Sequence, residues 1–273
     1  MSAAGGAPAI KPLWYKEIEP QNAKGTIIFI HGLFSSSKEW DAVTSFVPDY
    51  HLIVVDLPGH THSKHVPWSL DNAVEAIHRI VTEKDLLGKV HIVGLSLGGF
   101  VTLSFARRYP GGAKSIVVSG ATPLRGWSRW FTERSTMVYY MNWPIMKGPD
   151  WFYWWLCRLS GIPRHDELRA EIKQNFSYEL TVSGLGCLLD VQLDDLREIE
   201  RTRVALFSGG KHDDFENARA MARIIRQRCE ESKAFVVRKA IHAWDIQYPD
   251  LFANGVVAWI EGRTLPTDFE ELT

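Results

Sequence analysis

Six short apolar runs rich in β-branched residues alternate along this chain with stretches of helical periodicity. The runs cover residues 26–30, 52–55, 90–93, 115–118, 204–207 and 234–237. Short, continuously apolar runs are typical of strands buried on both faces, and neighbouring parallel strands need crossover connections that are usually helices. The alternation therefore predicts an α/β fold, with a mostly parallel central sheet flanked by helices on both faces.

Helical patterns fill the intervals between these runs. Ser69 followed by Asp71 opens one pattern that continues to about Leu87, because a serine before an acidic first turn is a typical helix start. A second pattern, over residues 97–108, stops before Pro110, since the residue before a proline disfavours the helical conformation. The other predicted helices cover residues 217–227 and 251–260.

The alternation is interrupted between about residues 121 and 201, where helical periodicity continues through aromatic stretches and no strand-like run occurs. A chain of 273 residues with 45% hydrophobic residues can bury one sizeable core, so one domain with an insertion is more natural than two domains. We expect residues 1–121 and 202–273 to form the core domain and residues 122–201 to form an inserted helical cap, or lid.

Composition narrows the classes of partner. The formal net charge of −1 gives no electrostatic reason to expect nucleic acid or an anionic membrane. Three scattered cysteines predict buried free thiols in a reducing compartment. Residues 1–11 contain no apolar run, so the sequence predicts neither a secretory signal nor a transmembrane segment, and the cytoplasm is the expected location. No cofactor is expected, and the oligomeric state stays open.

The strongest chemical signal is the run Gly94-Leu95-Ser96-Leu97-Gly98, which directly follows one predicted strand and precedes a predicted helix. A sharp turn between strand and helix holds a serine in a strained conformation with its Oγ free above the sheet, and small residues let strand and helix approach closely. The same turn directs the Leu97 amide and the helix N-terminus at the place where negative charge develops on a substrate oxygen. Ser96 is therefore the predicted nucleophile.

A second donor for that oxygen is predicted in the run His31-Gly32-Leu33-Phe34. The glycine lets the backbone bend after the first strand, so that the Leu33 amide can face the substrate. We expect the His31 ring to brace this loop rather than to react. Asp56, in the turn before Pro58 and Gly59, is expected to be architectural.

The predicted acid and base come from the C-terminal part of the chain. Asp213 follows the strand 204–207, which places its carboxylate beyond a strand's carboxyl end, and Asp214 is the rival. His242 follows the strand 234–237 and is the predicted base. The chain order Ser96, Asp213, His242 differs from the orders of the two large serine-protease folds.

With these motifs in place, the chain resembles the α/β-hydrolase superfamily, in the branch with a helical cap. The resemblance spans residues 27–260 and implies that fold, the catalytic triad and an ester-hydrolysing activity. Residues 46–60 are similar to monoacylglycerol lipases, and residues 38–59 also resemble the menaquinone-pathway synthase that eliminates pyruvate. Thr61 departs from the family pattern, which usually has glycine there, so the conformation of this loop needs testing.

Residues 60–65 allow a different interpretation, because His60, His62 and His65 nearly match the histidine signature of zinc-dependent hydrolases. Lys64 stands where that signature has an aspartate, and a cation there opposes metal binding. We therefore expect no metal site.

The aromatic residues of the cap carry the remaining information on specificity. They either pack the cap onto the core, or line an apolar acyl pocket, or touch a membrane transiently. The candidate substrate-binding residues are Phe34, Trp130, Trp154, Trp155 and Trp244.

The predicted function is hydrolysis of an ester, lactone or thioester of a hydrophobic or aromatic small molecule through an acyl-enzyme on Ser96. Two alternatives stay open. The same triad can serve a C–C bond hydrolase or a lyase, and this scaffold can also be a non-catalytic small-molecule receptor.

Overall fold

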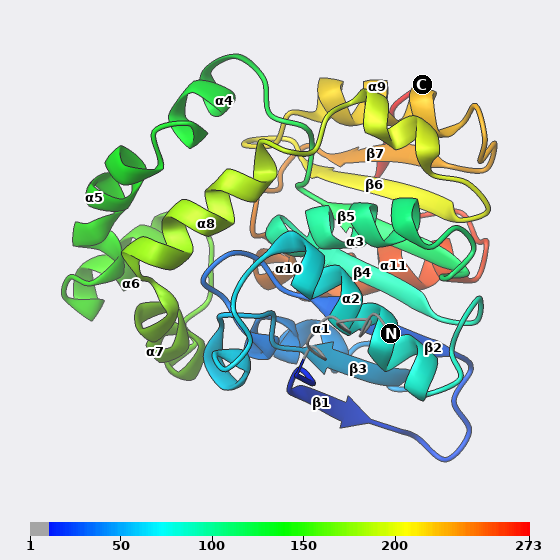
Figure 1. The fold of residues 1–273 in the computed structure, drawn as a ribbon, viewed down its shortest axis with the longest axis horizontal. Coiled ribbons are helices and arrows are strands. Elements are labelled where there is room, and N and C mark those ends of the chain that lie inside the picture. Colours follow the sequence, from blue (N-terminus) through cyan, green and yellow to red (C-terminus); the bar gives the residue numbers. More distant parts are fainter. Residues whose placement is uncertain (1–10) are drawn as a thin grey trace, which may run out of the picture.

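The computed structural model describes residues 11–273 and contains one eight-stranded sheet in the order β1-β3-β2-β4-β5-β6-β7-β8 (Figure 1). The stretch 1–10, where the sequence predicts no leader or span, lies outside the described residues. Neighbouring strands from β3 to β7 pair in parallel, and β1 and β8 add antiparallel edges. The strands are β1 (Tyr15–Ile18), β2 (Thr26–Ile30), β3 (His51–Val55), β4 (His91–Leu95), β5 (Ser115–Ser119), β6 (Arg203–Gly209), β7 (Lys233–Val237) and β8 (Glu270–Glu271).

The six strands predicted from apolar runs are confirmed, with ends that shift by at most two residues. The two edge strands were not predicted. β1 is largely exposed and reads Tyr-Lys-Glu-Ile, and β8 is a pair of glutamates, so neither carries the apolar signal of a buried strand.

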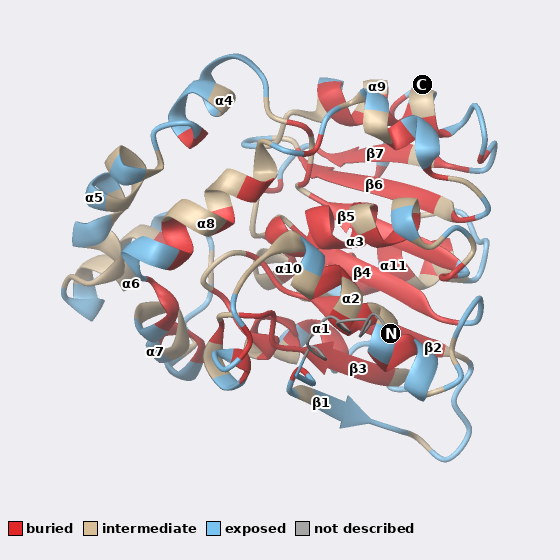
Figure 2. Cartoon of the chain, viewed as in Figure 1, coloured by how far each residue is buried: buried red, intermediate tan, exposed pale blue. Residues whose placement is uncertain are grey.

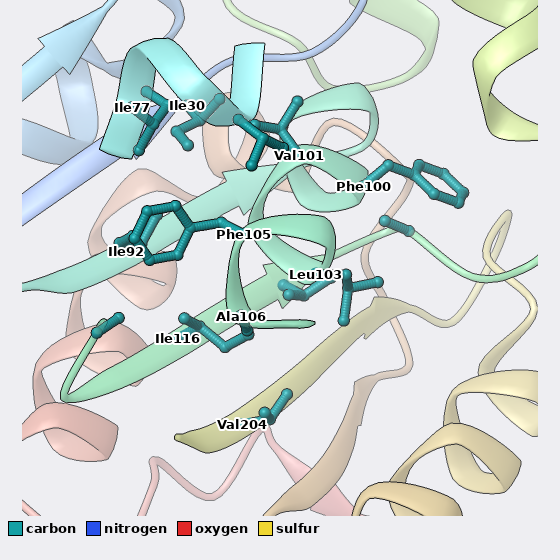
Figure 3. Close-up of a cluster of buried hydrophobic side chains, with 14 of the residues drawn as sticks. Ile30, Ile77, Ile92, Phe100, Val101, Leu103, Phe105, Ala106, Ile116 and Val204 are labelled. Carbon is teal, nitrogen blue, oxygen red and sulfur yellow. The ribbon is translucent and has the colours of Figure 1, made fainter. Parts of the chain in front are cut away.

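Helices cover both faces of the sheet, and alternate residues of each strand feed separate cores. The flanking helices are α1 (Asp41–Thr44), α2 (Leu70–Glu83), α3 (Leu97–Arg108), α9 (Phe215–Ile225), α10 (Trp244–Gln247), α11 (Pro249–Ile260) and the short 3-10 helices Ser37–Trp40 and Thr61–Ser63. Ile28 and Ile30 pack under α2, α3 and α9, whereas Ile27 and Phe29 pack under α1, α10 and α11. Figure 3 shows α3 lying on the first of these faces, with Phe105 close to the sheet.

The chain between β5 and β6 forms helices and no strand, and every residue of this segment is described. The helices lie beyond the carboxyl ends of the parallel strands (Figure 1). They are α4 (Gly126–Thr132), α5 (Ser135–Met146), α6 (Asp150–Leu159), α7 (Asp166–Asn175), α8 (Tyr178–Leu188) and the 3-10 helix Asp194–Glu198. The division of the chain into a core domain and a cap domain stays a prediction.

Burial differs sharply between the two parts (Figure 2). The central strands are buried along almost their whole length, while α4, α5 and α6 are mostly exposed or half-buried. Within residues 11–273, no helix has both the length and the apolar character needed to cross a bilayer.

Candidate active site

Ser96 sits at the turn between β4 and α3 with φ 52° and ψ −115°, a left-handed conformation that is rare for a residue with a side chain. The flanking glycines are required by contact. A methyl group on Gly98 would lie 2.7 Å from the carbonyl oxygen of His31 and would also overlap that of Ile30. One on Gly94 would overlap the Gly98 carbonyl. The turn therefore brings strand and helix as close together as the motif predicts.

His242 lies in the loop after β7, and its Nδ1 is 2.6 Å from Oδ1 of Asp213. The second oxygen of Asp213 accepts the Gly209 amide at 2.7 Å. The side chain of Asp213 is 5% exposed, whereas that of His242 is 41% exposed. The acid is thus buried and fixed, while the imidazole can be reached from outside.

The rival carboxylate, Asp214, has other partners. It accepts two hydrogen bonds from Arg125, at 2.6 and 2.7 Å, and caps α9 by accepting the Asn217 amide. The structure therefore pairs His242 with Asp213 and not with Asp214.

The end of β5 brings the serine turn and the histidine loop together. The Ser119 carbonyl accepts the Ser96 amide at 2.8 Å, and the next residue, Gly120, lies against the His242 ring. Gly120 has φ 61°, and a methyl group there would be 2.6 Å from Cε1 of His242. Sequence reasoning missed Gly120, because a lone glycine after a strand carries no signal of what packs against it.

Two neutral histidines hold the loop that follows β2. His31 accepts the Leu57 amide at 3.0 Å, and His60 accepts the Phe34 amide at 3.1 Å, both through Nε2. Burial lowers the pKa of both rings, that of His60 to about 3, so both stay uncharged at working pH. His31 occupies the bracing position expected of it, and His60 shares the task.

This bracing leaves the two predicted oxyanion donors available. No group among residues 11–273 accepts a hydrogen bond from the Leu33 or the Leu97 amide. Leu97 opens α3, where the helix N-terminus adds a favourable field for negative charge. The Cβ position of Gly32, the residue before Leu33, is 3.6 Å from Cβ of Ser96. Leu33 thus follows a residue that contacts Ser96, and Leu97 follows Ser96 itself.

Thr61 shows how the chain tolerates its departure from the family pattern. It adopts φ 35°, which strains a β-branched residue. Asn175 of α7 accepts the Thr61 amide at 2.9 Å and donates to the Thr61 hydroxyl at 2.9 Å. These two bonds hold the threonine in a conformation that glycine adopts without strain.

The histidines of residues 60–65 do not converge on a common point. His62 bonds the buried carboxylate of Asp56 at 2.7 Å, and His65 bonds the Pro12 carbonyl at 3.0 Å. Asp56 also accepts the Ser37 amide at 2.7 Å, which agrees with an architectural role.

Glu39, a buried carboxyl group at the site, was not assigned from the sequence. Its Oε2 accepts the Gly32 amide at 2.7 Å, so it holds the same loop. Burial raises the pKa of Glu39 to about 7. The pKa of buried Asp245 is also raised, by burial and by the charge of Glu39. Burial alone would lower the pKa of His242, but its hydrogen bond to Asp213 and the charges of Asp213 and Glu39 raise it overall.

This electrostatic arrangement predicts a pH effect. His242 must be neutral to act as a base, so the acid limb of kcat/KM should lie above the ordinary imidazole pKa of about 6.5. Glu39→Gln keeps an acceptor for the Gly32 amide but removes a charge that raises the pKa of His242. We expect the acid limb to move to lower pH, as measured by kcat/KM profiles of both proteins. Exposed Glu167→Gln is the matched control, and an unmoved limb in Glu39→Gln would show that Glu39 does not act on His242.

A cavity of about 140 Å³ lies beside the loop 33–35 and is also lined by Ala243, the residue after His242. Of the predicted substrate-binding residues, Phe34 and Trp154 line it. The complete lining is Leu33, Phe34, Ser35, Glu39, Met146, Tyr153, Trp154, Ile162, Pro163, His165, Leu168, Arg169, Ile172, Ala243 and Ile246.

The other three predicted substrate-binding residues lie elsewhere. Trp244 is fully buried in the core. It donates to the Ser119 hydroxyl at 3.0 Å and so helps to hold the end of β5, which bonds Ser96. Trp130 and Trp155 are exposed on α4 and α6, outside the cavity lining. For Trp155, proximity in sequence to the cavity residue Trp154 was misleading, because adjacent helical residues point in different directions.

Comparison with known proteins identifies the family of this chain. The model of the alpha/beta hydrolase family matches residues 27–255. An AB hydrolase superfamily protein of Gibberella zeae is 27% identical over 266 residues, which span 94% of this chain and 87% of that protein. The monoacylglycerol lipase ABHD6 of Homo sapiens is 37% identical over 98 residues, 34% of this chain and 29% of the lipase. A thermophilic esterase from Thermogutta terrifontis shares the fold, with a TM-score of 0.70 at 19% identity over 92% of this chain and 93% of the esterase. The chain therefore belongs to the alpha/beta hydrolase family.

Proposed function

We propose that this protein hydrolyses a carboxylic ester, lactone or thioester of a hydrophobic or aromatic small molecule through an acyl-enzyme on Ser96. The observation that carries the proposal is the pairing of His242 with Asp213, together with a serine held at positive φ and two nearby amides that have no acceptor among the described residues. These features support acyl transfer, which needs a nucleophile, a base held by an acid, and donors for the oxyanion.

The mechanism follows from the hydrogen bonds. Because Nδ1 of His242 donates to Asp213, Nε2 is the nitrogen left to accept a proton. Ser96 Oγ attacks the acyl carbon while Nε2 takes its proton, and the Leu33 and Leu97 amides donate to the oxyanion. The imidazolium then protonates the departing alcohol. Water attacks the acyl-enzyme with the same proton transfers, which releases the acid and restores Ser96.

The cavity sets the proposed substrate. Its lining is mainly aliphatic and aromatic, which suits an apolar acyl group. Two buried donors on it, Nη1 of Arg169 and Nε1 of Trp154, have no hydrogen-bond partner among the described residues. An acceptor oxygen in the substrate would satisfy one of these donors, whose burial is otherwise costly.

Turnover of p-nitrophenyl esters of graded acyl length tests this function. We expect saturable hydrolysis, with kcat/KM highest for an acyl group that fills the cavity. Tight ligand binding without hydrolysis of any ester would instead favour a receptor.

Trp154→Ala should shift selectivity towards short esters. Loss of its apolar contact is expected to lower kcat/KM for long or aromatic acyl groups by roughly tenfold, and that for acetyl esters much less. The neighbour Trp155, which is 52% exposed, provides the matched control. Trp155→Ala should leave kcat/KM unchanged for all dissolved esters. Equal losses on all esters, in step with the melting temperature, would mean that Trp154 only packs the helices together.

A further inference from the structure

Three consecutive helices, α4, α5 and α6, expose large apolar side chains to an unusual degree. α5 contains no buried residue and no charged residue over its 12 positions, and α6 has a single buried residue, Cys157. Trp127 and Trp151 are 77% and 73% exposed. The exposed large apolar residues of these helices, here called the aromatic face, are Trp127, Trp130, Phe131, Tyr140, Met141, Trp143, Trp151, Trp155 and Leu159.

These side chains follow helical periodicity, so they form stripes. On α6, the exposed residues Trp151, Trp155 and Leu159 recur every fourth position, while Tyr153 and Trp154 line the cavity. One side of α6 therefore borders the candidate active site, and the opposite side belongs to the aromatic face.

The other two helices repeat the pattern. On α4, Trp127 is followed by exposed Trp130 and Phe131, three and four positions later. On α5, Tyr140 is followed by Trp143 three positions later. An apolar stripe on a surface helix normally packs against something, so three neighbouring exposed stripes indicate a missing partner.

Cationic side chains outnumber carboxylates in the segment that contains these helices. The carboxylates between residues 126 and 159 are Glu133 and Asp150, and both form ion pairs, with Arg129 at 3.0 Å and with Arg169 at 3.1 Å respectively. Two exposed cations accompany the aromatic side chains: Arg158 on α6, and Arg134, which lies 4.0 Å from the Trp130 ring centroid. The net charge of −1 for the whole chain conceals this local excess of cations.

We propose that the aromatic face binds the surface of a lipid bilayer that contains anionic headgroups. A membrane interface suits exposed tryptophan and tyrosine side chains that are flanked by arginines. The rings enter the boundary between headgroups and acyl chains, and the cations contact lipid phosphates. A second copy of this chain is a poorer occupant. A twofold contact would place the face against itself, and the face offers no unpaired carboxylate for its arginines.

Binding in this orientation would bring the cavity near the lipid, since α6 contributes to both. The interaction does not depend on the proposed ester hydrolysis. A hydrophobic substrate dissolved in the bilayer would nevertheless reach the candidate active site without crossing water.

Co-sedimentation with vesicles tests the proposal. We expect the protein to bind vesicles of phosphatidylcholine with phosphatidylserine more tightly than phosphatidylcholine alone, with affinity falling as salt rises. The double variant Trp127→Ser/Trp151→Ser should lower the partition coefficient by at least about tenfold. Phe46→Ser, which removes a 50%-exposed aromatic ring far from this face in sequence, should leave it unchanged.

The arginines provide a second comparison. Arg134→Ala and Arg158→Ala should each weaken binding to the anionic vesicles by about fivefold. Exposed Lys114→Ala is the control and should bind as the wild type does. Melting temperature and turnover of a dissolved acetyl ester should be unchanged in all of these variants.

Two results would overturn the proposal. One is equal binding by the wild type and the tryptophan double variant, or no binding by either. The other is a concentration-dependent dimer in analytical ultracentrifugation that the double variant abolishes, which would assign the aromatic face to a second copy of the chain.

Discussion

Ser96→Ala is expected to lower kcat/KM for the best p-nitrophenyl ester by at least about 10⁴-fold. The substitution removes the attacking oxygen but keeps Cβ, and alanine makes the same backbone demand as serine at φ 52°. The free energy of unfolding should therefore change little. The measurement is steady-state kinetics beside a thermal melt of the same preparation.

The outcome also separates the chemistries that this fold supports. Near-wild-type turnover by folded Ser96→Ala would remove the covalent mechanism. Residual turnover of a C–C or elimination substrate by the variant would instead point to His242 acting as a base without a serine nucleophile.

Asp213→Asn should cost about 10³- to 10⁴-fold in kcat. The Gly209 amide requires the asparagine oxygen as its acceptor, so the NH2 group would face Nδ1 and, as a donor, would favour the wrong imidazole tautomer. Asp214→Asn is the matched control, one residue away. It weakens a surface ion pair with Arg125, whose side chain is 58% exposed, so we expect a small change in stability and near-normal kcat. If the two variants behaved the other way round, the loop after β6 would present the other carboxylate to His242 in solution.

The sequence predicted what local chemistry encodes strongly. Continuous apolar runs such as Ile27–Ile30 can only be buried strands in this context, and the glycines around Ser96 are dictated by contacts between neighbouring backbones. The carboxylate after β6 and the histidine after β7 could be located because parallel strands deliver their carboxyl ends to one edge of the sheet.

Features that depend on tertiary contacts could not be predicted. Glu39 reaches the loop at Gly32 across seven residues, and Asn175 reaches Thr61 from a helix more than a hundred residues away. Trp244 follows His242 in sequence but turns into the core, and Trp130 and Trp155 turn to the surface. Which side of a helix faces the cavity depends on how the inserted helices pack, and on α6 the five consecutive aromatic residues 151–155 surround the helix on all sides.

Charge illustrates the same limit. A near-neutral chain gave no reason to expect an anionic surface as a partner, whereas the fold exposes rings on α4, α5 and α6 together with Arg134 and Arg158. The distribution of charge over the surface, rather than its sum, decides the electrostatic argument.

Labelling with a fluorophosphonate, followed by intact-mass measurement and peptide mapping, tests the acyl-enzyme mechanism most directly. We predict one covalent adduct per chain, on the peptide containing Ser96, that is absent in Ser96→Ala and forms far more slowly in Asp213→Asn than in Asp214→Asn. An adduct on a different residue, or none in folded protein, would contradict Ser96 as the activated nucleophile.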